Sequence, residues 1–289
     1  MNYMEKLRDR LSTPRRTVFG KYALAGKEGA KEFARRIGVR VPETYFQGTL
    51  SKMPTVFPEN FVFKPAFAST SIGVRLLERT ASGDLKDLTS GEVLTREQLF
   101  AEATAIAERF KGEDADKAIF ILEELLVAPD GSKPPKDVRF YAFQGEIGLI
   151  LMESHLDSPA RAMYFDGGFR PFKDLHERYG IAPNAKSLEV IEDAVIPQNW
   201  KELLQVAKRI SVALPTAFCR IDLYDAQGGV CLGELTYTPG TFYYENRKLM
   251  SPAESERLGR MWTEAEERLV GSFVDLPPVV SPVTGSGEK

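Results

Sequence analysis

Residues 218–237 predict a β-hairpin near the C-terminal end of the chain, and this prediction constrains the fold more than any other feature. Two apolar runs, 218–224 and 230–237, have the length and the residue types of strands. Between them lies Asp225-Ala-Gln-Gly-Gly229, a segment rich in residues that favour turns. We therefore expect the two runs to pair with each other as antiparallel strands.

The length of this loop determines which side chains share a face of the hairpin. With the five-residue segment as the loop, Asp222 lies opposite Leu232, and Glu234 lies opposite Arg220. Side chains alternate between the two faces of a strand, so the face with Asp222 and Glu234 also carries Arg220 and Thr236. A register shift of one residue would instead separate the two carboxylates.

Two carboxylates on one face predict a cation between them, because like charges at this distance repel each other. Mg²⁺ prefers oxygen ligands and often combines a few carboxylates with phosphate oxygens. Asp222 and Glu234 are therefore candidate ligands of Mg²⁺. The alternative is an ordinary surface hairpin in which Arg220 forms a cross-strand ion pair with Glu234, and the spacing alone leaves both interpretations open.

Lys64 stands at the end of a short apolar strand that begins at Phe61. A lysine held at a strand end is a point charge suited to a phosphate oxygen. The loop that follows can place backbone N–H groups and hydroxyls over a polyphosphate, since it contains the small residues Ser69, Thr70, Ser71 and Gly73. A lysine beside a polar loop is also common without any function, so this segment alone indicates little.

Two further segments place charged side chains on strands. Residues 119–126 run from an apolar strand into Glu123 and Glu124. Free backbone groups at a strand end can bind an adenine edge and a carboxylate can hold a ribose hydroxyl, whereas two exposed acids at a sheet edge are the alternative. Asp137 and Arg139 fall on one face of the next strand, where they can pair with each other or Arg139 can reach a phosphate.

Composition narrows the class of protein. The chain has 289 residues, 43% hydrophobic content and a net charge of −3, which suits a packed core and does not indicate a nucleic-acid partner. Cys219 and Cys231 are too few for a secreted disulfide framework, and on one face of the hairpin we expect them to be buried free thiols. Neither a signal peptide nor an apolar run of ~18 residues is evident, so we expect a cytoplasmic protein without a membrane span.

In their order along the chain, these features resemble the ATP-grasp superfamily, and especially its TupA-like branch, which is associated with teichuronopeptide-type cell-surface polymers. The resemblance extends from about Val56 to Trp262, and the hairpin is its most specific part. The motifs that carry it are Phe63-Lys-Pro65, Glu123-Glu-Leu-Leu126, Asp137-Val-Arg-Phe-Tyr141, Tyr164-Phe-Asp166, Arg220-Ile-Asp-Leu-Tyr224 and Gly233-Glu-Leu-Thr-Tyr-Thr-Pro-Gly240.

The resemblance implies an α+β fold, the ATP-grasp fold, in which two α+β lobes enclose a nucleotide cleft. It implies a short N-terminal lobe of helix and strand at 1–55, a small lobe with the lysine strand at 56–127, and a large lobe with the carboxylate hairpin at 128–272. The remaining residues, 273–289, are rich in Pro, Gly and Ser, and we expect a disordered tail there.

The resemblance also implies a role for each candidate residue. The residues that would bind ATP are Lys64 at the phosphates, Ser69, Thr70, Ser71 and Gly73 in a mobile lid, Glu123, Glu124, Leu125 and Leu126 in an adenine-binding hinge, and Asp137 at the ribose. The catalytic cations would be Arg139 and Arg220. The ligands of Mg²⁺ would be Asp222, Glu234 and Thr236, although the commonest relatives carry Asn in place of this threonine. Arg75 is the candidate replacement for a second lysine that many relatives carry.

These roles imply an enzyme that uses ATP and Mg²⁺ to convert a carboxylate into an acyl phosphate and then joins it to an amine. The partners implied are small-molecule carboxylate and amine substrates. Two alternatives remain open, a phosphotransferase with a hydroxyl acceptor on the same scaffold and a nucleotide-binding protein without catalytic activity.

Overall fold

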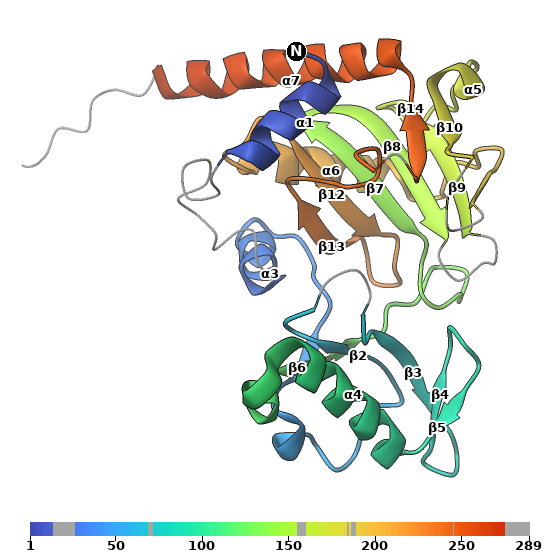
Figure 1. Ribbon diagram of the computed structural model, residues 1–289. Coiled ribbons are helices and arrows are strands. Elements are labelled where there is room, and N and C mark those ends of the chain that lie inside the picture. The colour runs from blue at the N-terminus through green and yellow to red at the C-terminus, as the bar shows by residue number, and fades with distance from the viewer. Residues whose placement is uncertain are drawn as a thin grey trace, which may run out of the picture.

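The computed structural model describes residues 1–13, 27–68, 72–154, 160–183, 185, 189–244 and 246–274. Within these residues the chain forms two six-stranded sheets and one two-stranded ribbon. Figure 1 shows the two larger sheets as separate bodies, each with its own helices, and the chain crosses between them more than once. The fold is therefore α+β with two lobes, as predicted.

The smaller body is built on the sheet β1-β6-β2-β3-β4-β5. Helix α4 covers one face of this sheet and contributes Leu99, Ala103 and Ala107 to its core. The helix begins after Thr95, whose side chain accepts a hydrogen bond from the backbone N–H of Gln98 in a capping box. The elements are β1 (Thr44–Gly48), β2 (Asn60–Pro65), β3 (Arg75–Arg79), β4 (Leu85–Asp87), β5 (Val93–Leu94), α4 (Arg96–Lys111) and β6 (Phe120–Glu124), with short 3-10 turns at Leu50–Lys52 and Gly112–Lys117.

The larger body is built on the sheet β11-β9-β8-β7-β12-β13, in which β11 and β9 are parallel and the other neighbours antiparallel. Its strands are β7 (Asp137–Phe143), β8 (Glu146–Ser154), β9 (Ala160–Phe165), β11 (Glu189–Ile191), β12 (Cys219–Tyr224) and β13 (Cys231–Thr236). In the two-stranded ribbon, β10 (Tyr179–Ile181) pairs with β14 (Lys248–Met250). Strand β10 directly follows the short helix α5 (Leu175–Arg178).

Helices pack on both faces of the larger sheet. On one face, α3 (Lys27–Arg36) and α6 (Trp200–Ala213) cover a core that is mostly aliphatic and includes three phenylalanines. On the other face, α1 (Tyr3–Ser12) and α7 (Pro252–Val274) lie side by side over an aromatic core that contains Tyr141, Phe218 and Trp262. None of the helices in the described ranges has an apolar stretch long enough to cross a bilayer.

The first 55 residues contribute to both bodies. Helix α1 packs on α7, α3 packs on the larger sheet, and β1 pairs with β6 at the edge of the smaller sheet. The division of the chain into lobes at 1–55, 56–127 and 128–272 stays a prediction. The first two residues of the predicted tail, 273 and 274, belong instead to helix α7, and residues 275–289 lie outside the described residues.

The β12–β13 hairpin forms, but its register differs from the predicted one. Asp222 pairs directly with Glu234, and Arg220 pairs with Thr236. For both residues of β12, the observed partner on β13 lies two positions further along the chain than the expected partner. A shift of two residues leaves the faces unchanged, so the four side chains share one face as predicted.

A β-bulge at Gly233 causes part of this difference. The ladder passes from Asp222 opposite Glu234 to Leu223 opposite Leu232, which leaves Gly233 as the additional residue. A Cβ atom on Gly233 would lie 2.6 Å from Cε2 of Tyr224, so the ring packs against the backbone only because this residue has no side chain.

Because of the bulge, the two cysteines lie on different faces of the hairpin. Both are buried free thiols, as expected. The expectation that they share a face is wrong, because Cys231 pairs with Tyr224 and packs with Leu126 and Ala226, whereas Cys219 lies in the core beneath α3 and α6.

Replacement of Gly233 by alanine tests this packing. We expect Gly233→Ala to lower the free energy of unfolding by about 1–3 kcal/mol, since the ring of Tyr224 must move. Gly180→Ala in β10 is the matched control, because a Cβ atom there approaches only Leu249, at 4.0 Å, and a change within about 0.5 kcal/mol is expected. Equal urea midpoints for the two variants would show that the ring of Tyr224 does not depend on the missing side chain at Gly233.

Candidate functional site

The face of the larger sheet that α1 and α7 cover changes character toward the smaller body. Near the helices it is aromatic, and at the start of β7, where the chain arrives from β6, it becomes charged. Cross-strand pairing aligns Asp137 with Glu153 and Tyr224, and Arg139 with Asp222. Strands β7, β8, β12 and β13 therefore place their charged side chains together at the end of the sheet that faces the other body.

Arg220 and Asp222 form the centre of this cluster. Nε of Arg220 donates to Oδ1 of Asp222 at 2.7 Å, and Nη2 lies 2.5 Å from Oδ2, which is a two-point ion pair along one strand. The residue Asp222 is 4% exposed. Burial raises the pKa of Asp222 to about 7, although the guanidinium groups of Arg220 and Arg139 act in the opposite direction.

Arg220 also contacts β13 and the loop that follows it. Nη2 donates to Oγ1 of Thr236 at 3.0 Å and lies 3.8 Å from a carboxylate oxygen of Glu234. Nη1 donates to Oγ1 of Thr241 at 3.5 Å. The side chain of Glu234 is 65% exposed, so one carboxylate of the hairpin is buried and the other faces solvent.

Arg139 occupies the next position across the sheet. Its Nε donates to Oδ2 of Asp137 at 2.8 Å, its guanidinium forms an ion pair with Glu153, and it lies 4.0 Å from Asp222. Glu153 in turn pairs with Lys248 of β14. The cluster therefore alternates positive and negative groups over four strands and the ribbon.

Glu153 and Lys248 were not predicted as site residues. Glu153 stands at the end of an apolar run, as Glu123 does, so the same sequence pattern could have identified it as a candidate. Lys248 carries no such signal. Only the folding of the β10–β14 ribbon against the sheet brings it to Glu153.

On the smaller body, Lys64 lies on the sheet face opposite to α4. Its neighbour Phe63 points into the core beneath α4, and successive side chains of a strand alternate. Lys64 pairs with Glu123 across β2 and β6, and Lys31 of α3 reaches the same carboxylate at 2.8 Å. Glu123 is 5% exposed, so the alternative of two exposed acids is wrong for this residue.

Glu124 and the residues after it connect the two bodies. Glu124 pairs with Arg40, whose guanidinium also donates to the backbone oxygen of Gln227 at 2.8 Å in the β12–β13 loop. Leu125 and Leu126 are buried directly after β6, and Leu126 packs against Cys231 of β13. The predicted hinge therefore runs along the contact between the smaller sheet and the hairpin.

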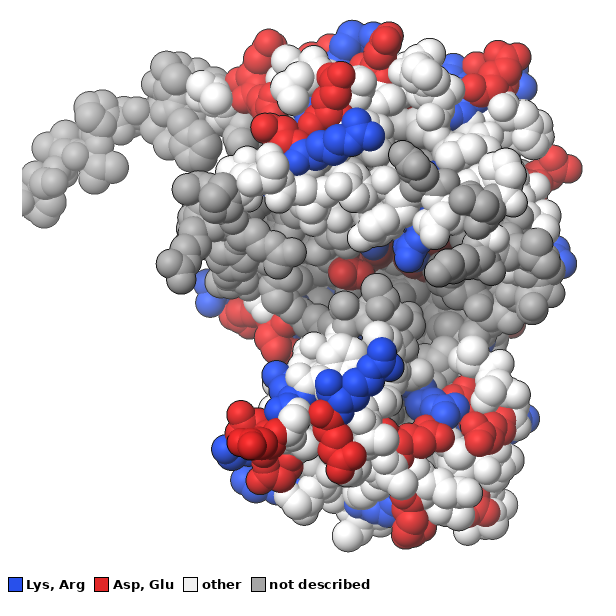
Figure 2. Space-filling view, viewed as in Figure 1, with Lys and Arg blue, Asp and Glu red and all other residues white. Residues whose placement is uncertain are grey.

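The surface of the molecule is hollowed between the two bodies. Figure 2 shows this hollow running across the molecule between the two bodies, with acidic and basic side chains inside it. The contacts of Arg40 and Leu126 bring the end of β6 against the hairpin that carries Asp222 and Glu234. The lysine strand β2, which pairs with β6, and the carboxylate hairpin are thus connected through the residues at the end of β6.

A family model described as TupA-like ATPgrasp matches residues 10–254, which is most of the chain. The chain belongs to the TupA-like ATP-grasp family. This confirms the resemblance that the motifs indicated and the fold expected from it.

Solved structures that resemble this ATP-grasp chain share little sequence with it. The D-alanine–D-alanine ligase from Bacillus anthracis complexed with ATP is 13% identical, with a TM-score of 0.46, and the match covers 86% of this chain and 68% of that one. The ligase PsnB with its precursor peptide PsnA2 and AMPPNP is 13% identical at a TM-score of 0.42, covering 87% and 60%. The L-amino acid ligase from Bacillus licheniformis is 14% identical at 0.40, covering 80% and 44%. Among curated proteins, none matches the chain.

The hairpin residues fit the Mg²⁺ that the family implies. Asp222 and Glu234 stand directly opposite each other and offer the oxygen ligands that Mg²⁺ prefers, although the guanidinium of Arg220 also contacts both carboxylates. In the described ranges no three His, Cys, Asp or Glu side chains form a metal cluster, so phosphate or water oxygens would have to complete the shell. Thr236 is close enough to Arg220 to accept its hydrogen bond, and its role as a ligand stays a prediction.

The lid predicted for this ATP-grasp chain is described only in part. Ser69, Thr70 and Ser71 lie outside the described residues. Gly73 has a φ of +70°, and a Cβ atom there would lie 2.8 Å from Cδ1 of Ile106, so the chain requires glycine where the lid segment returns to β3.

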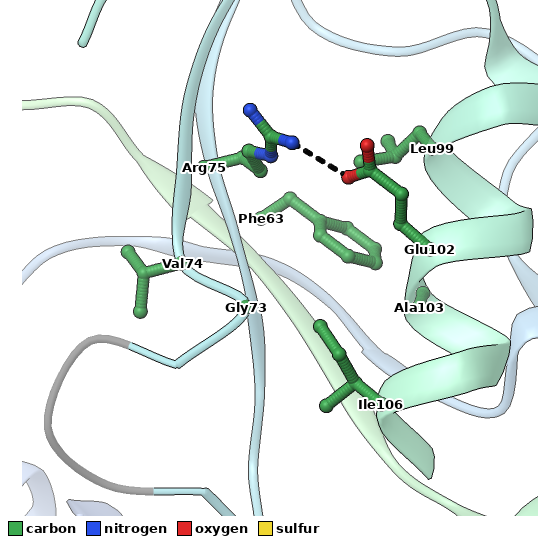
Figure 3. A pocket seen from close by; sticks show the side chains of 8 residues that line it. All are labelled: Phe63, Gly73, Val74, Arg75, Leu99, Glu102, Ala103 and Ile106. Carbon is green, nitrogen blue, oxygen red and sulfur yellow. Dashed lines mark hydrogen bonds and ion pairs between the residues drawn. The ribbon is translucent and has the colours of Figure 1, made fainter. Parts of the chain in front are cut away.

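The interpretation of Arg75 as a second phosphate-binding cation is wrong. Arg75 pairs across the sheet with Phe63, so it lies on the α4 face, away from Lys64. It binds Asp87 at 2.8 Å and Glu102 of α4 at 2.7 Å. Arg75 and Glu102 border a cavity of about 270 Å³, which is also lined by Phe63 of β2, by Gly73 and Val74, and by three apolar residues of α4. Figure 3 shows their ion pair at its edge.

Removal of the guanidinium of Arg220 tests the centre of the cluster. We expect Arg220→Met to destabilise the fold by about 3–5 kcal/mol, because the carboxylate of Asp222 stays buried without its principal partner. Arg220→Lys retains a charge but not the two-point geometry, so its loss should be smaller. Urea denaturation measures both, and a stability of Arg220→Met equal to that of the unmodified chain would show that Asp222 does not depend on this pair.

Proposed function

We propose that this chain is an ATP- and Mg²⁺-dependent ligase, which activates a carboxylate as an acyl phosphate and joins it to an amine. The observation that carries the proposal is the direct pairing of Asp222 with Glu234 beside two arginines, on a hairpin that is packed against a residue just after β6, the neighbour of the lysine strand. Membership of the TupA-like ATP-grasp family supports the same chemistry.

ATP would bind as a substrate in the hollow between the two bodies. Lys64 would turn from Glu123 to a phosphate oxygen, and the backbone at Glu124, Leu125 and Leu126 would meet the adenine edge. Asp137, at the first position of β7, would accept a hydrogen bond from the ribose. The support for this orientation is that β6 leads directly into the contact with the hairpin.

Asp222, Glu234 and Thr236 would hold Mg²⁺, which supplies positive charge at the transferring phosphoryl group. Phosphoryl transfer depends mainly on positioning and charge neutralisation rather than on a covalent nucleophile of the protein. The remaining positive charge comes from Arg220 and Arg139, whose guanidinium groups are fixed by their carboxylate partners. Groups held in advance need little reorganisation when charge develops.

The reaction would proceed in two displacements. A carboxylate oxygen of the first substrate attacks the γ-phosphorus, and ADP leaves with the electrons of the broken bond. The amine then attacks the acyl carbon, inorganic phosphate leaves, and the amine loses a proton. Exclusion of water from the hollow by the lid segment would protect the acyl phosphate from hydrolysis.

Because the TupA-like branch is associated with cell-surface polymers, we propose that the product is a building block of such a polymer or of a peptide-like natural product, made in the cytoplasm. An ADP-release screen over pooled carboxylates and amines, with products identified by mass, tests the reaction class. An amide product supports the ligase, and a phosphorylated alcohol would show the phosphotransferase instead.

Glu234→Gln tests the metal ligand with the least effect on folding. The side chain is largely exposed, so stability should change by less than about 0.5 kcal/mol. ADP release should fall by at least about a hundredfold, because the transition state loses charge neutralisation. Glu256→Gln, at an exposed position of α7, is the control and should keep full activity. Unchanged turnover in Glu234→Gln would remove Glu234 from the metal site.

The pKa of Asp222, about 7, predicts how Mg²⁺ binding depends on pH. The metal binds the ionised carboxylate, so a proton competes with it below this pKa. The Mg²⁺ concentration for half-maximal ADP release should therefore fall as the pH rises from 6, by at most about tenfold per pH unit, and level off above pH 8. A requirement for Mg²⁺ that is constant from pH 6 to 8 would contradict ligation by Asp222.

A further inference from the structure

Lys31 reaches the carboxylate that also holds Lys64. Nζ of Lys31 lies 2.8 Å from Oε2 of Glu123 and donates to Oγ1 of Thr44 at 3.1 Å, while Lys64 binds the other oxygen of Glu123. Lys31 is 7% exposed. A buried ammonium group, that of Lys31, and a partly exposed one, that of Lys64, therefore share one carboxylate.

The three charges belong to different parts of the molecule. Glu123 and Lys64 stand on β6 and β2 of the smaller sheet. Lys31 stands on α3, whose Ala30 and Ala34 pack in the core of the larger sheet. The ion pair between Lys31 and Glu123 consequently joins the two bodies at the predicted hinge.

The sharing of Glu123 affects what Lys64 can do. Burial by itself raises the pKa of Glu123, but the ammonium groups of Lys64 and Lys31 outweigh that effect and hold the pKa below its usual value. If Lys64 turns to a phosphate, Glu123 keeps Lys31 as its counter-ion. Without Lys31, the same movement would leave a buried carboxylate without a cation from the described residues, which is strongly unfavourable.

We propose that Lys31 is a positioning residue that neutralises Glu123 and so frees Lys64 to bind the triphosphate of ATP. This inference rests on the proposed function, since it assigns Lys64 to the phosphates. Lys31 itself does not touch the nucleotide. Its effect is selective, because it concerns the phosphates and not the nucleoside.

The dissociation constants of ATP and of adenosine, measured on the full chain with Mg²⁺, distinguish this role from a general effect on the hinge. Lys31→Met should weaken ATP binding about tenfold or more and change adenosine binding less than twofold. Lys31→Arg keeps the charge and should restore most of the affinity for ATP. Lys6→Met is the control, because Lys6 is a similarly buried lysine whose ion pair, with the half-exposed Glu266, joins α1 to α7 within the larger body.

A double variant keeps the test informative if Lys31→Met folds poorly. In Lys31→Met/Glu123→Gln the carboxylate is gone and Lys64 is released, so the ratio of ATP affinity to adenosine affinity should recover toward that of the unmodified chain. A ratio that stays low, an equal loss for both ligands in Lys31→Met, or full ATP affinity in Lys31→Met would each overturn the proposal. Absence of ATP binding in the unmodified chain would instead refute the proposed function.

Discussion

The two-point ion pair between Arg220 and Asp222 is the interaction on which the rest of the site depends. It lies along one strand, so the backbone of β12 fixes its geometry without help from a loop. From this pair, Arg220 reaches Thr236, Glu234 and Thr241, and Asp222 lies within 4.0 Å of Arg139. Removing both charges from water is costly, and the network of hydrogen bonds is what offsets that cost.

The two bodies meet through a second set of charges that follows the same logic. Glu123 and Glu124 are consecutive in β6, so their side chains point to opposite sides of the strand. Each forms an ion pair with a residue from the N-terminal part of the chain, Glu123 with Lys31 and Glu124 with Arg40. Arg40 then extends the contact to the hairpin loop. The position of the lysine strand relative to the carboxylates is therefore set by ion pairs at the hinge as well as by the apolar contact of Leu126 with Cys231.

Local pattern predicted the parts of the site that depend on alternation along a strand. The shared face of Arg220, Asp222, Glu234 and Thr236 needed only the parity of the hairpin, so it survived an error of two residues in register. The bulge at Gly233 could not be predicted, because it depends on the ring of Tyr224 packing against the glycine.

Contacts between distant segments could not be read from the sequence. Lys31 reaches Glu123 only because α3 packs between the two bodies. Lys248 reaches Glu153, the partner of Arg139, only because the β10–β14 ribbon packs against the larger sheet. The prediction that Arg75 binds a phosphate was wrong for a related reason. Its strand was identified correctly, but the sequence does not show which face of the sheet α4 covers. Motif order, by contrast, identified the family, because it does not require the packing.

We propose above all that Asp222 and Glu234 share one divalent cation with the phosphates of ATP. Electron paramagnetic resonance of Mn²⁺ in the presence of AMPPNP measures this most directly, because free and protein-bound Mn²⁺ give different spectra. The account predicts tight Mn²⁺ binding that requires the nucleotide and is lost in both Asp222→Asn and Glu234→Gln. Mn²⁺ bound equally well by those variants, or bound without any influence of AMPPNP, would contradict it.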